Sequence, residues 1–129
     1  MFCMKVKTED RTKRVKVAAD KAAFRSFSHA AASIRKDAVA SIEVSPDPSS
    51  PGDPPHTRRR LLPRAVRFAV DKQGAVIGPT ASIAGQVGGT HEFGGQYKGE
   101  QYPERRFMFP ALERALPRFA GQWKGSIGE

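Results

Sequence analysis

Apolar residues recur at helical spacing early in the chain. Steps of three, four or seven positions keep residues on one helix face, and the following residues obey them: Val17, Phe24, Phe27, Ala31, Ile34, Ala38 and Ile42. The alanines between them favour a helix further. We therefore predict an amphipathic helix over about residues 18–43. Pro46 and Pro48 end it, because proline lacks the backbone donor that a continuing helix needs.

A period of two follows in the middle of the chain. Val66, Phe68 and Val70 alternate with polar or small residues, which is typical of a half-buried strand. The sequence DKQG at residues 71–74 then separates this segment from AVIG. The pattern predicts a β-hairpin whose second strand ends at Gly78-Pro79.

The C-terminal third contains one further strand pattern and one helix pattern. Alternation of Phe107 and Phe109 with polar or flexible neighbours predicts a third strand over residues 105–109. Pro110 occupies the favoured first position of a helix, predicted over about residues 110–120. Its inward residues are expected to be Leu112, Ala115, Leu116 and Phe119, and Pro117 is expected to kink or shorten it.

The remaining segments are predicted to lack regular structure. Residues 1–16 form a basic flexible arm that carries Lys5, Lys7, Arg11, Lys13, Arg14 and Lys16. Residues 45–60 form an exposed loop rich in proline and arginine, and residues 81–95 form a glycine-rich loop with at most a short helical turn. Residues 17–129 then make a single α+β domain, in which a long N-terminal helix and a short C-terminal helix pack on a small antiparallel sheet.

Charge adds the strongest global signal. The chain of 129 residues has a formal net charge of +9 and a sequence pI of about 10.2, which favours contact with nucleic acid, an anionic membrane or an acidic protein. Arg58, Arg59 and Arg60 follow the proline-rich segment directly. Arginine binds phosphates and carboxylates alike, so these residues predict either a basic rim that contacts DNA or an acidic partner, or a run of charges that stays in water. The chain contains no apolar run long enough for a membrane span and no secretory signal, so we expect the protein in the cytosol.

Catalytic and metal sites are not predicted. The pair His91-Glu92 would fit a zinc helix only with a second histidine at position 95, which is Gly95. His29 and His56 lie in other predicted elements, and Cys3 is the only cysteine. The sequence also marks no nucleophile with a base and an orienting acid. We therefore expect a protein that is not an enzyme and binds no cofactor or metal.

Two motifs in fixed order carry a family resemblance. His91-Glu92-Phe93-Gly94 is followed by a polar segment and then by Pro103, Arg105, Phe107, Pro110 and Ala111. Upstream stands the proline-rich element PGDPPHT at residues 51–57. This order resembles the head-to-tail joining family of long-tailed bacteriophages, the neck or tail-completion proteins akin to minor tail protein Z. The resemblance covers residues 18–120, with RRRLL standing where the family often has Thr-Gly-x-Leu.

The resemblance implies a structural virion protein at the head–tail junction, assembled in the bacterial cytoplasm. Its implied partners are copies of itself in a sixfold or twelvefold ring, other phage neck, connector and tail-tube proteins, and DNA in the channel. The candidate contacts with neighbouring subunits or partners are Arg58, Arg59, Arg60, His91, Glu92, Phe93 and Arg105. The alternative is a small basic nucleic-acid-binding protein, which the charge and the arginine run favour.

Overall fold

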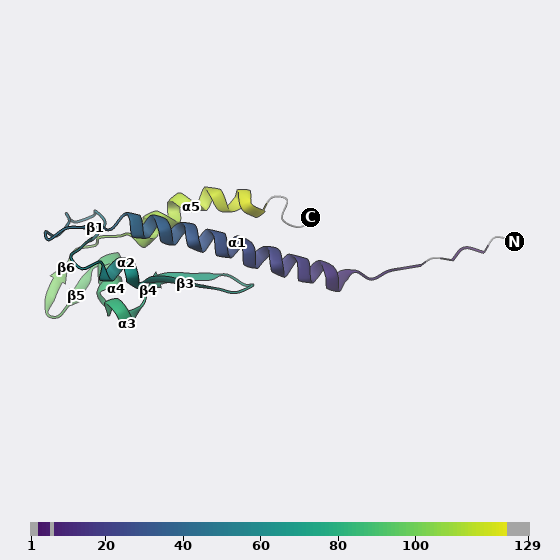
Figure 1. Ribbon diagram of the computed structural model, residues 1–129, viewed down its shortest axis with the longest axis horizontal. Coiled ribbons are helices and arrows are strands. Elements are labelled where there is room, and N and C mark those ends of the chain that lie inside the picture. Colours follow the sequence, from purple (N-terminus) through teal and green to yellow (C-terminus); the bar gives the residue numbers. More distant parts are fainter. Residues whose placement is uncertain (1–2, 6, 124–129) are drawn as a thin grey trace.

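The computed structural model describes residues 3–5 and 7–123 of the chain, and it has an α+β fold (Figure 1). Helices and pairs of short strands follow one another along the described residues. Their order is α1 (Thr12–Ala40), β1 (Glu43–Val44), β2 (His56–Thr57), α2 (Leu61–Ala65), β3 (Val66–Val70), β4 (Ala75–Pro79), α3 (Ala81–Ala84), α4 (Val87–Phe93), β5 (Gly95–Tyr97), β6 (Glu100–Tyr102) and α5 (Met108–Trp123).

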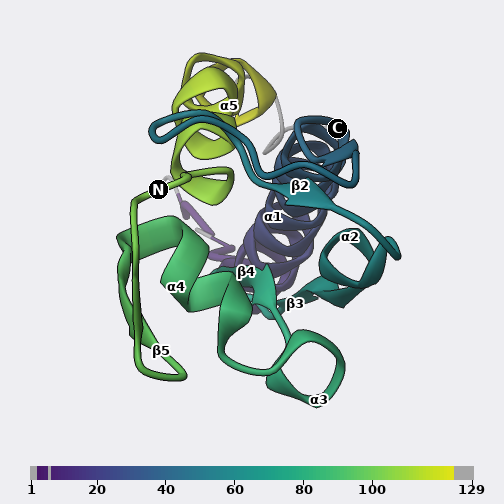
Figure 2. The same ribbon diagram turned by 90° about the vertical axis from the view of Figure 1, so that its left-hand side faces the viewer.

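The long helix α1 is the element on which the others pack. It has 29 residues, which corresponds to a length of about 43 Å. Figure 2 shows it nearly end-on, with α5 on one side and the β3–β4 hairpin on the other. The buried residues of α1 are mostly small, which lets these neighbours approach its backbone closely: Ala22, Ser26, Ala30, Ala31, Ile34 and Ala38. The predicted helix is confirmed, but it runs from Thr12 to Ala40 and not from about residue 18 to residue 43. Val17 and Phe24, which were expected on its apolar face, are 60% and 50% exposed because no other described element packs over them.

The early start of α1 corrects the predicted N-terminal arm. Asp10 Oδ1 accepts the backbone N–H of Thr12 at 2.9 Å, and hydrogen bonds from Thr12 lower the pKa of Asp10. Lys13, Arg14 and Lys16 therefore belong to the first turns of a helix and not to an irregular segment. The alanine-rich sequence that follows them favours continuation of the helix in both directions.

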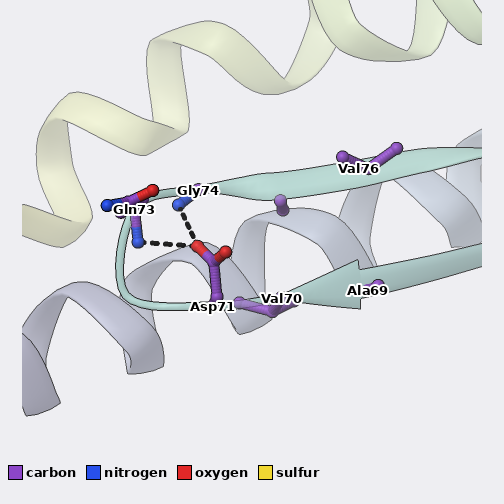
Figure 3. Close-up of a pocket in the computed structure, with 7 residues that line it drawn as sticks. Ala69, Val70, Asp71, Gln73, Gly74 and Val76 are labelled. Carbon is purple, nitrogen blue, oxygen red and sulfur yellow. Dashed lines mark hydrogen bonds between the residues drawn. The ribbon is translucent and has the colours of Figure 1, made fainter.

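The β3–β4 hairpin is confirmed. Its register pairs Val66 with Pro79 at the open end and Val70 with Ala75 at the turn. Asp71 Oδ1 accepts the backbone N–H groups of Gln73 at 2.7 Å and of Gly74 at 2.9 Å, which closes the turn (Figure 3). A two-stranded hairpin is marginally stable alone, so its packing against α1 is required.

The strands form three separate pairs and not one sheet within the described residues. β1 and β2 are parallel, while β5 and β6 form a second antiparallel hairpin that the sequence did not predict. Lys98 and Gly99 turn this hairpin with positive φ angles of 51° and 81°, the combination that tight hairpin turns require. The predicted strand at residues 105–109 is wrong, because Met108 already begins α5.

The predicted glycine-rich loop at residues 81–95 contains the helices α3 and α4. Glycine is used there for close packing. A Cβ atom at Gly88 would lie 2.2 Å from Cγ of Pro79, so α4 contacts the end of β4 at a distance that only glycine permits. Gly94, with φ of 68°, then ends α4. The prediction of a loop was wrong, because the contact of Gly88 with Pro79 outweighs the low helix propensity of the glycines.

The main core lies between α1, α2, β3 and α5. Its buried members are Ile34, Ala38, Ile42, Leu62, Val66, Phe107, Ala111 and Ala115. Leu116 was expected to point inward, but it is 53% exposed. Ser49, Pro55 and Thr57 are buried, so the segment 45–60 is packed on the core at these positions and is not the wholly exposed loop that its composition predicted.

Gly88 and Gly89 give a matched test of the α4 contact. We expect Gly88→Ala to destabilise the fold by about 1–3 kcal/mol, because the methyl group would overlap Pro79. Gly89→Ala has no atom within 4 Å of the new Cβ, so it should be neutral or stabilise the helix by up to about 1 kcal/mol. Urea denaturation measures both. Equal effects of the two substitutions would contradict the proposed contact.

Candidate functional site

Glu92 connects the two family-like motifs. It lies on α4, and its side chain is buried. Its Oε2 accepts the backbone N–H groups of Phe107 and Met108 at 3.0 Å each, and its Oε1 accepts that of Phe109 at 2.9 Å. These N–H groups belong to the start of α5, where no preceding turn supplies acceptors. The carboxylate therefore caps α5, and its charge is favourable at the positive end of the helix dipole.

Arg105 holds the segment that leads into α5. Its backbone N–H donates to the carbonyl oxygen of His91 at 2.7 Å, and its Nε donates to the carbonyl oxygen of Ser49 at 3.0 Å. The backbone N–H of Gly52 donates to the carbonyl oxygen of Glu104 at 2.9 Å. We call the set of Ser49, His91, Glu92, Arg105 and Phe107 the Glu92 junction. It joins α4, α5 and the proline-rich segment.

His91 lies at the edge of the Glu92 junction. Burial, and secondarily the positive charge of Arg105, lower the pKa of its imidazole. Its Nδ1 is buried and has no hydrogen-bond partner within the described part of the chain. A neutral ring is therefore favoured at this position. His91 also lines a surface depression, so it is the member of the junction that borders the exterior.

Phe93, the other apolar candidate of this motif, is 76% exposed at the end of α4. The side chains of Glu92 and Arg105 form hydrogen bonds inside the fold, whereas Phe93 is exposed to solvent. A large exposed aromatic side chain is a frequent anchor in protein interfaces. Its role as a contact stays a prediction.

The predicted arginine run lies on a concave surface. Arg58 and Arg59 border a depression of about 470 Å³ together with His91 and apolar side chains of α2, α3 and α4. Arg58 Nε donates to the carbonyl oxygen of Pro46 at 3.0 Å. Arg60 has a left-handed conformation with φ of 57° and precedes α2 directly. The structure thus brings Arg58 and Arg59 near His91, but Arg60 does not line this depression.

A second depression of about 620 Å³ adjoins the first, since Leu61 and Ile83 line both. It contains three further arginines from α1, α2 and β3: Arg35, Arg64 and Arg67. Arg35 faces the interior of the fold in part, since its Nε donates to the carbonyl oxygen of Val66 at 2.8 Å. Arg35 lies four residues after Ala31 and three before Ala38, which the sequence placed on the apolar face. This spacing could have indicated the inward position of Arg35.

The candidate basic residues near the N-terminus remain outside this site. Lys5, Lys7, Lys13, Arg14 and Lys16 are exposed, and Arg11 pairs with Glu9 at 2.8 Å. The first turns of α1 project beyond the hairpin and α5 (Figure 1). Val15 and Val17 in these turns are 57% and 60% exposed. The projecting turns therefore present apolar and basic side chains together.

Comparisons of the chain with protein-family models, with curated proteins and with solved structures find no match. Histidine, cysteine and acidic side chains form no group of three that could hold a metal ion in residues 3–5 and 7–123. Over the same residues, no helix has the length and apolar character needed to cross a membrane.

Removal of the Glu92 charge tests the cap. Glu92→Gln keeps one carbonyl acceptor but directs an amide at backbone N–H groups, so we expect a loss of about 1.5–3 kcal/mol in unfolding free energy. Glu113→Gln removes the same charge from an exposed position of α5 and should change stability by no more than about 0.5 kcal/mol. Chemical denaturation compares the two. A Glu92→Gln protein as stable as the control would contradict the cap.

The lowered pKa of His91 predicts a pH effect of defined sign. When the pH falls below the ordinary histidine value of 6.5, the unfolded chain takes up the proton more readily than the folded one. Stability is therefore lost as the pH falls through that region and is retained above it. We expect the melting temperature of His91→Gln to fall less than that of the wild type between about pH 7.5 and pH 5.5. An equal or greater fall would contradict the assignment.

Proposed function

We propose that this protein is a structural subunit of a tailed-bacteriophage virion, which forms a ring at the head–tail junction and joins the tail to the head. The observation that carries the proposal is the Glu92 junction. The two family-like motifs lie apart in the sequence, yet Glu92 binds three backbone N–H groups at the start of α5. The residues of the two motifs therefore hold α4 and α5 together. A protein that assembles with copies of itself needs such a fixed subunit shape.

The exposed apolar residues of α1 support a role in assembly. Val15, Val17 and Phe24 are 57%, 60% and 50% exposed. Val15 and Val17 belong to the first turns of α1, which project beyond the hairpin and α5 (Figure 1), and Phe24 lies near the middle of the helix. Exposed apolar surface of this kind is typical of contact sites. A head-to-tail contact between copies closes into a ring when the rotation between subunits closes. The projecting turns of one subunit are suited to such a contact.

The proposed location is the virion, after assembly in the host cytoplasm. The proposed partners are copies of this chain and the neck, connector and tail-tube proteins, with DNA passing through the ring. No enzymatic role or cofactor is part of the proposal. The alternative function, nucleic-acid binding, is favoured by the net charge of +9 and by the arginines beside Leu61, and it assigns the same basic surface to phosphates.

Deletion of the gene from its native genome tests the proposal. We expect electron microscopy to show filled heads and separate tails that accumulate unjoined, with joining restored by the wild-type gene. A Val15→Asp/Val17→Asp gene should not restore it, because charges in the projecting turns would prevent the contact between subunits.

Val44→Asp provides the matched control, since Val44 is also exposed, at 54%, but lies in β1. The control gene should restore joining, and both variant proteins should melt near the wild-type temperature. Normal infectious particles from the deletion would overturn the proposed function. Purified wild-type protein that stays monomeric and binds no head or tail protein would do the same.

A further inference from the structure

The two adjoining depressions form one surface, which we call the arginine groove. Leu61 and Ile83 belong to both depressions and lie where they meet. The groove includes no aspartate or glutamate among its lining residues. The arginines along it come from separate parts of the chain: Arg35, Arg58, Arg59, Arg64 and Arg67.

The positive charge of the groove is not neutralised within the subunit. In the part of the chain that the structure describes, the side chains of Arg59, Arg64 and Arg67 make no hydrogen bond or ion pair. Arg35 and Arg58 each donate one bond, from Nε to a backbone carbonyl. Their guanidinium groups carry further donors. Several guanidinium groups in one concavity attract carboxylates or phosphates.

Apolar side chains distinguish these two ligand classes. Leu61 and Phe68 are 47% and 40% exposed within the groove, and the partly buried Ile83 and Val87 contribute further apolar surface. Contacts to nucleic-acid phosphates need hydrogen-bond donors but no apolar side chains beside them. Protein interfaces, in contrast, combine an apolar centre with arginine around it. The groove has the second composition.

We propose that the arginine groove binds an acidic amphipathic segment of another protein, in which apolar side chains are flanked by carboxylates. The acidic stretches of a second copy fit this description less well. Glu9 and Asp10 are followed by Arg11, and Glu104 is followed by Arg105 and Arg106. Residues 43–53 have no basic neighbour, but their prolines prevent an amphipathic helix, and Ser49 packs them on their own core. The inference names a partner class for the joining role and rests on that proposed function.

Fluorescence anisotropy with the purified full chain tests the proposal. The probe is a labelled peptide of about 14 residues, roughly four helical turns, with leucines at positions i, i+3, i+4 and i+7 and glutamates elsewhere. Oligoglutamate of the same length tests charge alone, and a DNA duplex of about 20 base pairs tests phosphate binding. We expect the leucine-containing peptide to bind most tightly.

Two variants divide the contributions of charge and apolar surface. Arg64→Glu/Arg67→Glu should weaken peptide binding by about tenfold or more. Its matched control, Lys21→Glu/Arg25→Glu, changes the net charge equally at exposed positions of α1 outside the groove, and should weaken binding by less than about threefold. Leu61→Ser should weaken peptide binding but leave DNA binding unchanged. Melting curves verify that each variant is folded.

Three outcomes would overturn the proposal: no peptide binding by the wild type, equal losses in the groove variant and its control, or no loss in Leu61→Ser. Tighter binding of DNA than of peptide, lost in Arg64→Glu/Arg67→Glu and retained in Leu61→Ser, would assign the groove to nucleic acid instead. These measurements need no virion. A negative result for peptide binding is therefore distinguishable from a negative result for head–tail joining, which the deletion experiment measures.

Discussion

The three hydrogen bonds from the start of α5 to Glu92 are the constraint on which the arrangement of the other elements depends. The start of α5 is partly buried, because Phe107 is fully buried, and unpaired N–H groups there would be costly. Arg105 and Arg106 precede it and cannot act as side-chain acceptors. An acceptor must therefore come from elsewhere, and α4 supplies it. That requirement explains the close approach of Gly88 to Pro79, which places α4 within reach.

The same placement of α4 links the interior of the subunit to its groove. The carbonyl oxygen of His91 holds Arg105, while its ring lines the groove beside Arg58 and Arg59. A segment bound in the groove would contact the helix that caps α5. Binding there would then stabilise the subunit in the conformation that the Glu92 junction maintains, because a ligand that binds only the folded state shifts the folding equilibrium toward it.

Local patterns predicted the elements whose signals are local. The apolar repeat of α1 and the Asp71 turn lie within single windows of sequence, and a helix and a hairpin formed there, although α1 begins earlier and leaves Val17 and Phe24 exposed. The strand at residues 105–109 was wrong because five alternating residues resemble a strand, while the cap that makes α5 begin at Met108 comes from Glu92, 15 residues or more away. Arg58, Arg59 and His91 were identified from sequence, but their convergence with Arg35 and Arg64 depends on tertiary packing that no single window contains.

Net charge constrains how such subunits assemble. Copies that each carry +9 repel one another, and the ion pairs inside the described part of the subunit are largely exposed, so each contributes only about 0–1 kcal/mol. In the proposed ring, apolar contacts through the projecting turns of α1 would have to overcome that repulsion. An acidic segment in each arginine groove would reduce it, because carboxylates would neutralise guanidinium groups that the subunit leaves unpaired. Ring formation and partner binding would then favour each other through charge, with no conformational change required.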